Sequence, residues 1–412
     1  MYVSPLAPAA GGLHPVAPDR RVLSGSRSCA PRRRALALAA LLAVPSSAWA
    51  LEAEEVVRHD LYLGLGGYAK AAVASDGHVL LAWYTVKPAQ HREVVLAQWL
   101  APDGTPLGDS FEVARWRGLV AVAARPGRQG LIISRWASYR ESLLTVVNAG
   151  GVVRRWIGEE LGCDTGPVEV TAPEAGYFLA CSGTGWWLSE TGRPRQGVDL
   201  GTGYGEVALA GGPGRSVAAI YDQGARLRAR WMTPWQQGPT VELDDRFDLC
   251  CEDQASIEHL GDRVFGVAWV RKHERSADPE DGRRVTAVHA ATFRAPDRVR
   301  SSRRFSGLAE SVEAATGEQR RPHVLRTAAA EQVVAWFRCA YVGSPGGLAC
   351  FERDGLFLRA CVAGRPAGKI LEIADVAAGS QVLFTGERLL TLSPLRKAND
   401  RYYLEVRGFV LE

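Results

Sequence analysis

Residues 71–114 contain four short, mostly apolar runs separated by turn residues. The first two runs meet at Ser75-Asp76-Gly77 and the last two at Pro102-Asp103-Gly104. Asp-Gly between such runs is a strong hairpin signal, because glycine adopts the positive φ that a tight turn requires. One four-stranded unit leaves an apolar face uncovered, so it must stack on other units of its kind.

The rest of the chain supplies six more units of this form. Each begins with an apolar strand, a turn and a second strand, at 119–136, 168–181, 207–221, 257–270, 324–337 and 381–394. The seventh unit ends after a third strand at 401–412, and an extra strand at 55–63 precedes the first unit. We therefore predict an all-β fold: a seven-bladed β-propeller of four-stranded antiparallel blades, closed by the N-terminal strand. Residues 51–412 would form this single domain, with about 52 residues per blade.

The second strand of most units ends in an aromatic residue, and we interpret these side chains as packing between blades: Trp83, Trp136, Tyr221, Trp269 and Trp336. The Ala-Trp of the second strand and the DGxPLGxxFxVA pattern of the second hairpin resemble the repeats of secreted bacterial β-propeller proteins. The resemblance covers nearly all of residues 51–412. It implies a fold rather than a function and matches no specific enzyme family. Asp-box, WD and kelch signatures are absent.

Residues 1–50 have the features of a leader that includes a secretory signal peptide. Arg32-Arg33-Arg34 precedes an apolar run at 35–44, and Ala48-Trp49-Ala50 predicts cleavage before Leu51. The run is too short to span a bilayer, and no cysteine at the cleavage point indicates a lipid anchor. The first ~30 residues lie outside a normal signal peptide, and indicate either an over-extended start or a long n-region. We expect a periplasmic or extracellular protein without a transmembrane anchor.

Removal of the leader changes the net charge. Residues 1–50 hold six arginines and one aspartate, a charge of +5, so the full-chain +4 becomes −1 in residues 51–412. The net positive charge of the whole chain therefore comes from the leader. Without this excess of positive charge, the main argument for a nucleic-acid partner disappears.

Insertions concentrate on one face of the predicted ring, the link face, which carries the second-to-third-strand loops and the links between blades. Long loops are expected at 85–92, 271–284, 338–355 and 394–401, in blades one, five, six and seven. Such clustering is typical of a binding face, although tolerated insertions would give the same pattern. The residues that we expect to bind a polar ligand there are Arg271, His273, Asp281, Arg338, Tyr341, Arg353 and Asp354.

Seven cysteines remain after the leader, and export permits disulfides. We predict the bridges Cys163–Cys181 and Cys339–Cys350. The adjacent Cys250 and Cys251 either bond to each other or to other partners. Cys361 is expected to be a buried thiol. No CxxC or paired histidine spacing accompanies these residues, so no metal site is expected.

Motifs of common enzymes are scarce: no GxSxG, HExxH or Walker sequence occurs. The GxGxG string at 201–205 lacks the following helix of a phosphate site, and 278–282 lacks the oxygen spacing of a calcium loop. The arginines at 294–304 are interpreted as solvated surface. Carboxylates in the links could serve glycoside hydrolysis if two of them came close together: Asp164, Asp244, Asp245, Asp248, Glu252 and Asp253.

These observations favour a binding or interaction module over an enzyme. The expected ligand is a polysaccharide or a protein, no cofactor is implied, and a monomer is expected. Two alternatives remain open: a carbohydrate-active hydrolase or lyase on the same propeller, and a structural protein of a surface assembly. Convergent carboxylates in a pocket would favour the enzyme, and a pocket with sparse polar groups would favour the binding module.

Overall fold

The structure is a computed structural model, and the account below covers residues 51–65, 68–87, 92–135, 141–157, 161, 163, 168–181, 183–201, 207–223, 226–245, 255–272, 286–295, 310–311, 318–327, 332–344, 347–362, 365–377, 380–397 and 401–412. The described residues belong to one compact unit, 46–412. The predicted leader lies outside them and stays a prediction. The described residues form no α-helix, and none of their elements is a helix that could cross a membrane.

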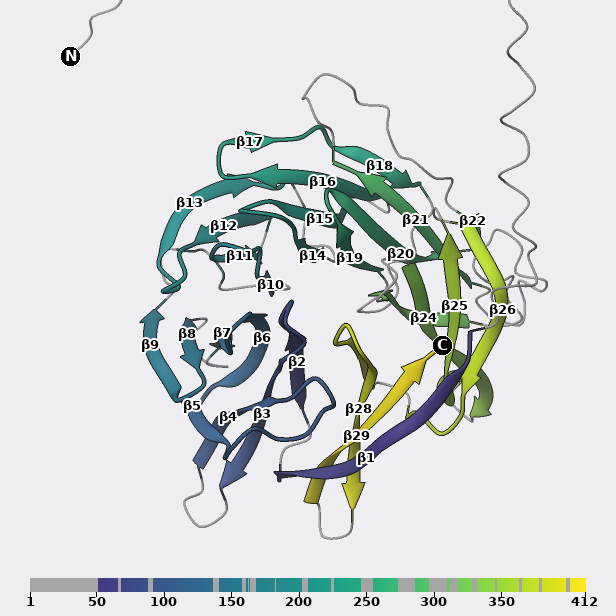
Figure 1. Ribbon diagram of the computed structural model, residues 1–412, viewed down its shortest axis with the longest axis horizontal. Helices are drawn as coiled ribbons and strands as arrows, with labels where there is room; N and C mark the ends of the chain where they lie inside the picture. The colour runs from purple at the N-terminus through teal and green to yellow at the C-terminus, as the bar shows by residue number, and fades with distance from the viewer. Residues whose placement is uncertain are drawn as a thin grey trace, which may run out of the picture. The chain divides into compact units, whose positions relative to one another are not determined.

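Seven antiparallel sheets follow one another around a ring (Figure 1), as the sequence predicts. Blade one consists of β2 (Ala69–Val73), β3 (Val79–Lys87), β4 (Arg92–Leu100) and β5 (Phe111–Arg115). Blade two consists of β6 (Gly118–Arg125), β7 (Gln129–Arg135), β8 (Ser142–Asn148) and β9 (Gly151–Ile157). Blade three consists of β10 (Val168–Thr171), β11 (Tyr177–Cys181), β12 (Thr184–Leu188) and β13 (Pro194–Asp199).

The second half of the ring follows the same order. Blade four consists of β14 (Val207–Gly211), β15 (Val217–Asp222), β16 (Leu227–Thr233) and an outer edge divided between β17 (Gln236–Gln237) and β18 (Val241–Asp244). Blade five consists of β19 (Ala255–Gly261), β20 (Val264–Lys272), β21 (Thr286–Arg294) and β22 (Glu310–Ser311). Blade six consists of β23 (Glu318–Arg326), β24 (Gln332–Ser344), β25 (Gly347–Val362) and β26 (Arg365–Ile373).

Blade seven joins the two ends of the domain. It consists of β27 (Gln381–Phe384), β28 (Leu389–Lys397), β29 (Arg401–Leu411) and the N-terminal β1 (Ala53–Gly64). Figure 1 shows β1 and β29 side by side, and their register runs from Ala53 opposite Leu411 to Gly64 opposite Tyr402. This pairing is the predicted closure, and it covers the edge that β29 would otherwise present to solvent.

Charged side chains reinforce the closing strand. Arg58 Nε donates to Glu405 Oε1 at 2.9 Å, and Arg407 Nε donates to Glu55 Oε2 at 2.9 Å. The arginines lie on opposite strands, so each strand supplies one cation and one carboxylate. The two pairs therefore tie β1 to β29 in addition to the backbone ladder.

The core lies between neighbouring blades, where the predicted aromatic residues are found. Trp83 of blade one packs with leucines of blade seven, and Tyr221 of blade four packs with aromatic residues of blade three. Trp269 packs against blade four and Trp336 against blade five. All four side chains are buried, which confirms the sequence interpretation for them. Trp136 lies outside the described residues.

The turns follow the sequence closely at the two Asp-Gly sites. Gly77 and Gly104 have φ of +84° and +88°, so both adopt the left-handed conformation for which glycine is selected. The backbone N–H of Gly77 donates to Ala74 O at 2.9 Å, and that of Gly104 donates to Ala101 O at 2.9 Å. These two bonds close the first and second hairpins of blade one.

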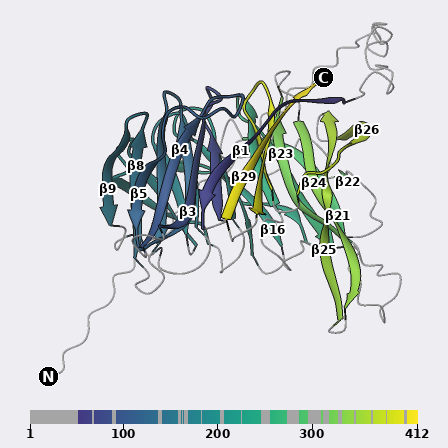
Figure 2. The ribbon, with the colours of Figure 1, turned by 90° about the horizontal axis from the view of Figure 1, so that it is seen from below.

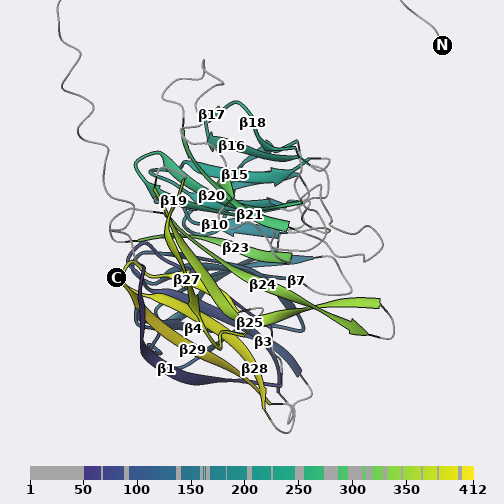
Figure 3. The same ribbon diagram turned by 90° about the vertical axis from the view of Figure 1, so that its right-hand side faces the viewer.

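Blades five and six depart from the predicted pattern. The sequence predicts the second hairpin of blade five within 285–305, but the structure places the outer strand of that hairpin at Glu310–Ser311. The expected loop at 338–355 is a hairpin, because β24 continues to Ser344 and β25 begins at Gly347. Figures 2 and 3 show this hairpin extending past the ends of the neighbouring strands.

A bulge separates that hairpin from the body of its blade. Phe337 pairs with Leu356 and Cys339 with Glu352, so three residues of β25 lie opposite one residue of β24. Gly355 within the bulge has a φ of +148°. Bulges bend a strand and increase its twist, and here the bulge lies where the hairpin leaves the blade. We call the part beyond it, 339–352, the blade-six arm.

Candidate functional site

A cavity of about 500 Å³ lies on the axis of the ring. Each blade contributes to it through its innermost strand, and blades one, two, three, six and seven also contribute through the turn that follows that strand. The lining residues are 72–75, 122–124, 126, 170–174, 209–211, 258–259, 324–327 and 382–386. These innermost strands surround the centre in Figure 1. The turn residues place the cavity on the face opposite the link face, where the hairpin turns lie. We call it the axial cavity.

Small side chains leave this space open. Ala72, Ala123, Ala172 and Ala210 all contribute to the wall, so the innermost strands present methyl groups and backbone to the axis. The backbones also approach one another closely: a Cβ added at Gly211 would lie 2.6 Å from Ala172 O. The cavity is therefore bounded by backbone and short side chains on strands.

Glu258 and Arg326 bring opposite charges to the axial cavity from adjacent blades. Glu258 lies on β19 and Arg326 is the last residue of β23, and solvent reaches both side chains. The surrounding blades desolvate the Glu258 carboxyl and raise its pKa to about 7, against smaller lowering effects from the His259 backbone N–H and the charge of Arg326. Among the described residues, neither side chain forms an ion pair.

Other polar groups at the cavity are engaged within the protein. Glu174 Oε2 accepts a hydrogen bond from the Gly214 backbone N–H at 2.7 Å. His259 Nε2 lies 2.9 Å from Asp262 O, and its ring packs against Phe265 with the centroids 5.2 Å apart. Glu258 and Arg326 are thus the charged groups of the described wall that face the cavity without a bonded side-chain partner.

On the link face, Arg271 lies at the end of β20 and is held by acidic residues of blade four. Its Nε is 3.5 Å from Asp244 Oδ1, and its Nη2 is 3.8 Å from Asp245 Oδ1. The other Asp244 oxygen accepts a 2.6 Å hydrogen bond from the Trp269 indole. Arg271 therefore neutralises a buried carboxylate, which is a structural role that the sequence analysis did not assign to it.

The remaining predicted ligand residues divide between the blade-six hairpin and undescribed segments. The Arg338 guanidinium lies 4.0 Å from the centroid of the Phe357 ring. Tyr341 is paired with Cys350 in the arm, and Arg353 and Asp354 lie in the bulge. The backbone thus brings Arg338, Arg353 and Asp354 to one level of blade six. His273 and Asp281 lie outside the described residues, so the predicted site as a whole stays a prediction.

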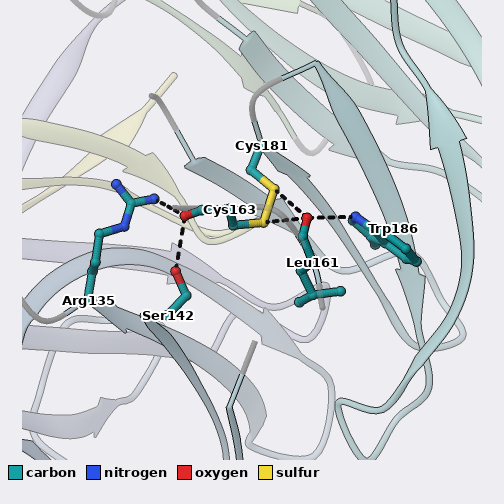
Figure 4. Close-up of a disulfide and its surroundings, with 6 residues drawn as sticks. All are labelled: Arg135, Ser142, Leu161, Cys163, Cys181 and Trp186. Atoms are coloured by element: carbon teal, nitrogen blue, oxygen red, sulfur yellow. Dashed lines mark hydrogen bonds between the residues drawn. A yellow bond between two sulfur atoms is a disulfide. The ribbon is translucent and has the colours of Figure 1, made fainter. Parts of the chain in front are cut away.

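The structure contains the predicted disulfide between Cys163 and Cys181, whose Cα atoms are 5.2 Å apart (Figure 4). Cys163 precedes β10 and Cys181 ends β11, so the bridge fastens the link entering blade three to that blade's second strand. Cys163 O accepts hydrogen bonds from Arg135 Nη2 at 2.6 Å and from Ser142 Oγ at 3.3 Å. The same link is therefore also tied to blade two.

The other cysteine predictions have different outcomes. Cys361 is buried in the third strand of blade six, as expected. Cys250 and Cys251 lie outside the described residues. Cys339 is paired with Glu352 and Cys350 with Tyr341, so the two cysteines lie two register positions apart. Their side chains are outside the described part of the structure, and the Cys339–Cys350 bridge stays a prediction.

The carboxylates considered for glycoside hydrolysis show no convergence among the described residues. Asp244 is buried against Trp269 and Arg271, and Asp245 shares the same arginine. Asp164, Asp248, Glu252 and Asp253 lie outside the described part of the chain. Within the described part, no group of three His, Cys, Asp or Glu side chains could hold a metal ion.

The axial cavity was not predicted from the sequence. A signal for it exists in the strand IEHLG at 257–261, where the charged Glu258 interrupts an innermost strand. Arg326 gives a similar signal at the end of the apolar run 324–326. An ionisable residue on an innermost strand is expensive unless it faces water or a partner, so two such residues in neighbouring blades point to a solvated axis.

Comparisons with known proteins add no functional information. No family model matches the chain, and no curated protein matches it either. Three similar solved structures are the β-propeller domain of the Trilobed protease from Pyrococcus furiosus (8% identity, TM-score 0.46, covering 83% of this chain and 94% of that one), Kuenenia stuttgartiensis hydrazine synthase (10%, 0.44, 82% and 94%) and the WD40 domain of SCAP from fission yeast (10%, 0.40, 87% and 98%). All three TM-scores are below 0.5, so the propeller assignment rests on this chain's own strand pairing.

Proposed function

We propose that this chain is a binding module that takes a small polar ligand into its axial cavity. The observation that supports this proposal is the cavity of about 500 Å³, which receives wall residues from all seven blades. Its size falls within the usual range of small-molecule sites, and its wall combines many apolar groups with a few charged ones. A preformed cavity on rigid strands reduces the entropic cost of binding.

The ionisable residues in the wall of the axial cavity favour binding over catalysis. Glu258 has a pKa near neutrality and could exchange a proton. Glycoside hydrolysis needs a second carboxylate at a defined separation, and the other wall carboxylate, Glu174, accepts a backbone hydrogen bond from Gly214. A single acid with no nucleophile or second carboxylate beside it, among the described residues, supports recognition better than hydrolysis.

Secretion is the second part of the proposal. The leader at 1–50 motivates it, and the Cys163–Cys181 disulfide is compatible with it, because such bonds persist in oxidising compartments. The binding module would then work in the periplasm or outside the cell. N-terminal sequencing of the exported protein should begin at Leu51, and a mature protein that retains residues 1–50 would contradict this part.

The cavity can be tested by filling it. Thr171 is a half-buried wall residue at the end of β10. The exposed Ser110, in the turn between β4 and β5, provides a control on the same face of the ring. We would screen wild type with free amino acids, di- to tetrapeptides and mono- to tetrasaccharides by calorimetry, and then measure Thr171→Trp and Ser110→Trp.

We expect at least one probe to bind wild type and Ser110→Trp alike, and to lose at least tenfold in affinity for Thr171→Trp. A probe that binds Thr171→Trp as tightly as wild type would place its site elsewhere. Absence of binding by every probe at millimolar concentration would also contradict the proposal. Circular dichroism of each variant shows whether the propeller has folded.

The link face supports a second candidate function, the recognition of a polysaccharide or a protein. The blade-six arm favours it, because a projecting hairpin offers backbone and side chains beyond the ring. Replacing residues 339–352 with a two-residue turn would remove the arm at its bulge. Loss of binding to a glycan array in that variant, with the axial cavity still able to bind its probe, would assign a separate activity to the link face.

A further inference from the structure

Glu258 and Arg326 occupy the same end of the axial cavity. Glu258 is paired with Gly266 in the first hairpin of blade five, and Arg326 is paired with Gln332 in that of blade six. A Cβ added at Gly261 would lie 3.7 Å from Arg326 Nη2, so the guanidinium reaches towards the turn that follows β19. The carboxylate and the guanidinium are therefore neighbours across a blade boundary.

The two charges are close enough to interact but are not joined. Arg326 lowers the pKa of the Glu258 carboxyl by its charge, yet no ion pair within 4.0 Å is present between the described side chains. Solvent reaches both groups through the cavity. Charged groups at a cavity that water rather than a protein side chain solvates are available to a ligand of opposite charge.

The rest of the wall is suited to a ligand with a small hydrocarbon part. Alanine, valine and leucine residues contribute to the wall in most blades, together with threonines and backbone groups. The other titratable residues of the described wall are His259, which is bonded to Asp262 O, and Glu174, which is bonded to the Gly214 N–H. A ligand at this end would therefore meet one open carboxylate, one open guanidinium and apolar surface between the blades.

We propose that the axial cavity binds a small zwitterion, with its ammonium group against Glu258 and its carboxylate against Arg326. The ligand class comprises free amino acids and short peptides, which share these two charges and differ in the distance between them. Arginine suits the second role because its planar guanidinium donates two parallel hydrogen bonds to a carboxylate. This inference rests on the proposed function and names the ligand of the same cavity.

The test is a titration of zwitterions of graded length, using glycine, β-alanine, 4-aminobutyrate, diglycine and triglycine, measured by calorimetry. Butylamine and butyrate carry only one of the two charges and serve as ligand controls. The variants are Glu258→Gln and Arg326→Gln. Control variants are Glu242→Gln and Arg226→Gln, which alter an exposed ion pair of blade four with a 3.1 Å separation.

We expect one zwitterion length to bind wild type at least tenfold more tightly than butylamine or butyrate. Glu258→Gln and Arg326→Gln should each weaken that zwitterion at least tenfold, and the two blade-four variants should leave it unchanged. Preference for glycine would assign free amino acids, and preference for diglycine or triglycine would assign short peptides.

Other outcomes separate this inference from the proposed function. Zwitterion binding that is unchanged in both cavity variants overturns the inference. A neutral saccharide could instead bind wild type, lose affinity for Thr171→Trp, and bind Glu258→Gln and Arg326→Gln as tightly as wild type. That result would overturn the zwitterion inference while supporting the proposed function. If Glu258→Gln fails to fold, the exchange variant Glu258→Arg/Arg326→Glu provides a second test, because it retains both charges. It should bind the zwitterion more tightly than Glu258→Arg or Arg326→Glu alone.

Discussion

Asp244 and Glu258 illustrate two ways in which this chain places a carboxylate inside the ring. Asp244 is buried and is compensated by the Trp269 indole and the Arg271 guanidinium. Glu258 has solvent on one side and a raised pKa, because the blades around it desolvate the carboxylate more than the charge of Arg326 compensates it. The first arrangement stabilises the contact between blades four and five. The second is the arrangement on which the proposed ligand binding at the axis depends.

The raised pKa of Glu258 makes stability depend on pH. The folded state retains the proton up to about pH 7, whereas an ordinary Glu releases it near 4.5, so the free energy of unfolding contributed by this group falls as the pH rises between these values. Glu258→Gln removes that term. Because solvent screens the exposed carboxylate, we expect the variant to gain only about 1 kcal/mol over wild type at pH 8 and nothing at pH 4.

Urea unfolding of wild type and Glu258→Gln at pH 4, 6 and 8 would measure this difference. Glu242→Gln, which replaces an exposed carboxylate of blade four, is the control variant. A difference between Glu258→Gln and wild type that is the same at pH 4 and pH 8 would contradict the titration of Glu258 in this range.

At the same scale, the sequence predicted ligand residues less well than core residues. The buried Trp83, Trp269 and Trp336 follow from position at the end of a second strand, which is a repeat property. Arg271 was chosen because it begins a long loop, but its charge is used by Asp244 across a blade boundary. Contacts between blades have no signature in local sequence spacing. Glu258 was overlooked although its charge interrupts an innermost strand, because the search for ligand residues was confined to the long loops of the link face.

At the scale of strands and hairpins, alternation and turn residues located most of the ring. The first two strands of every blade overlap the segments read from the sequence, although several strands extend beyond them, most of all β23 and β24 of blade six. The blade-six arm was missed because Ser344-Pro345-Gly346-Gly347 and the charged residues at 352–354 resemble loop composition. A hairpin stabilised mainly by backbone pairing needs no apolar face, so such composition does not exclude strands. The outer strand of blade five was misplaced because a two-residue strand carries no periodicity.

The Cys163–Cys181 bridge is the element whose contribution can be measured most directly. It closes a segment of 18 residues and holds the link between blades two and three. Replacing both cysteines with alanine should lower the free energy of unfolding by about 3 kcal/mol, mainly because the unfolded chain gains conformational freedom. The measurement is urea unfolding of the two proteins with and without reductant.

The control for this experiment is Cys361→Ala, which alters a buried cysteine of blade six without touching the bridge. Reductant should destabilise wild type and Cys361→Ala, and its effect should be largely absent in Cys163→Ala/Cys181→Ala. A double variant as stable as wild type would show that the hydrogen bonds of Cys163 O with Arg135 and Ser142 suffice to hold this link.

At the scale of the whole ring, the two faces have different constructions. The hairpin-turn face has short turns around the axial cavity, whereas the link face carries the blade-six arm and the Cys163–Cys181 bridge. Figure 2 shows the arm projecting on one side of the ring only. A cavity that receives residues from seven blades depends on complete closure, because opening the ring at any blade boundary would separate its walls. Closure and the proposed binding are therefore expected to be linked.

Deletion of residues 51–63 tests closure and this linkage together. The deletion removes almost all of β1, including Leu63, which is buried against blades seven and one, and it leaves Arg407 and Glu405 without their partners on β1. We expect the truncated protein to aggregate through the exposed edge of β29 or to lose its single cooperative transition in calorimetry. Arg58→Ala, which removes the solvent-exposed arginine of one ion pair and keeps the strand, should leave the protein monomeric and change its melting temperature far less than the deletion does. A truncated protein that is monomeric by gel filtration, melts at the wild-type temperature and still binds the cavity probe would show that the ring closes without its N-terminal strand.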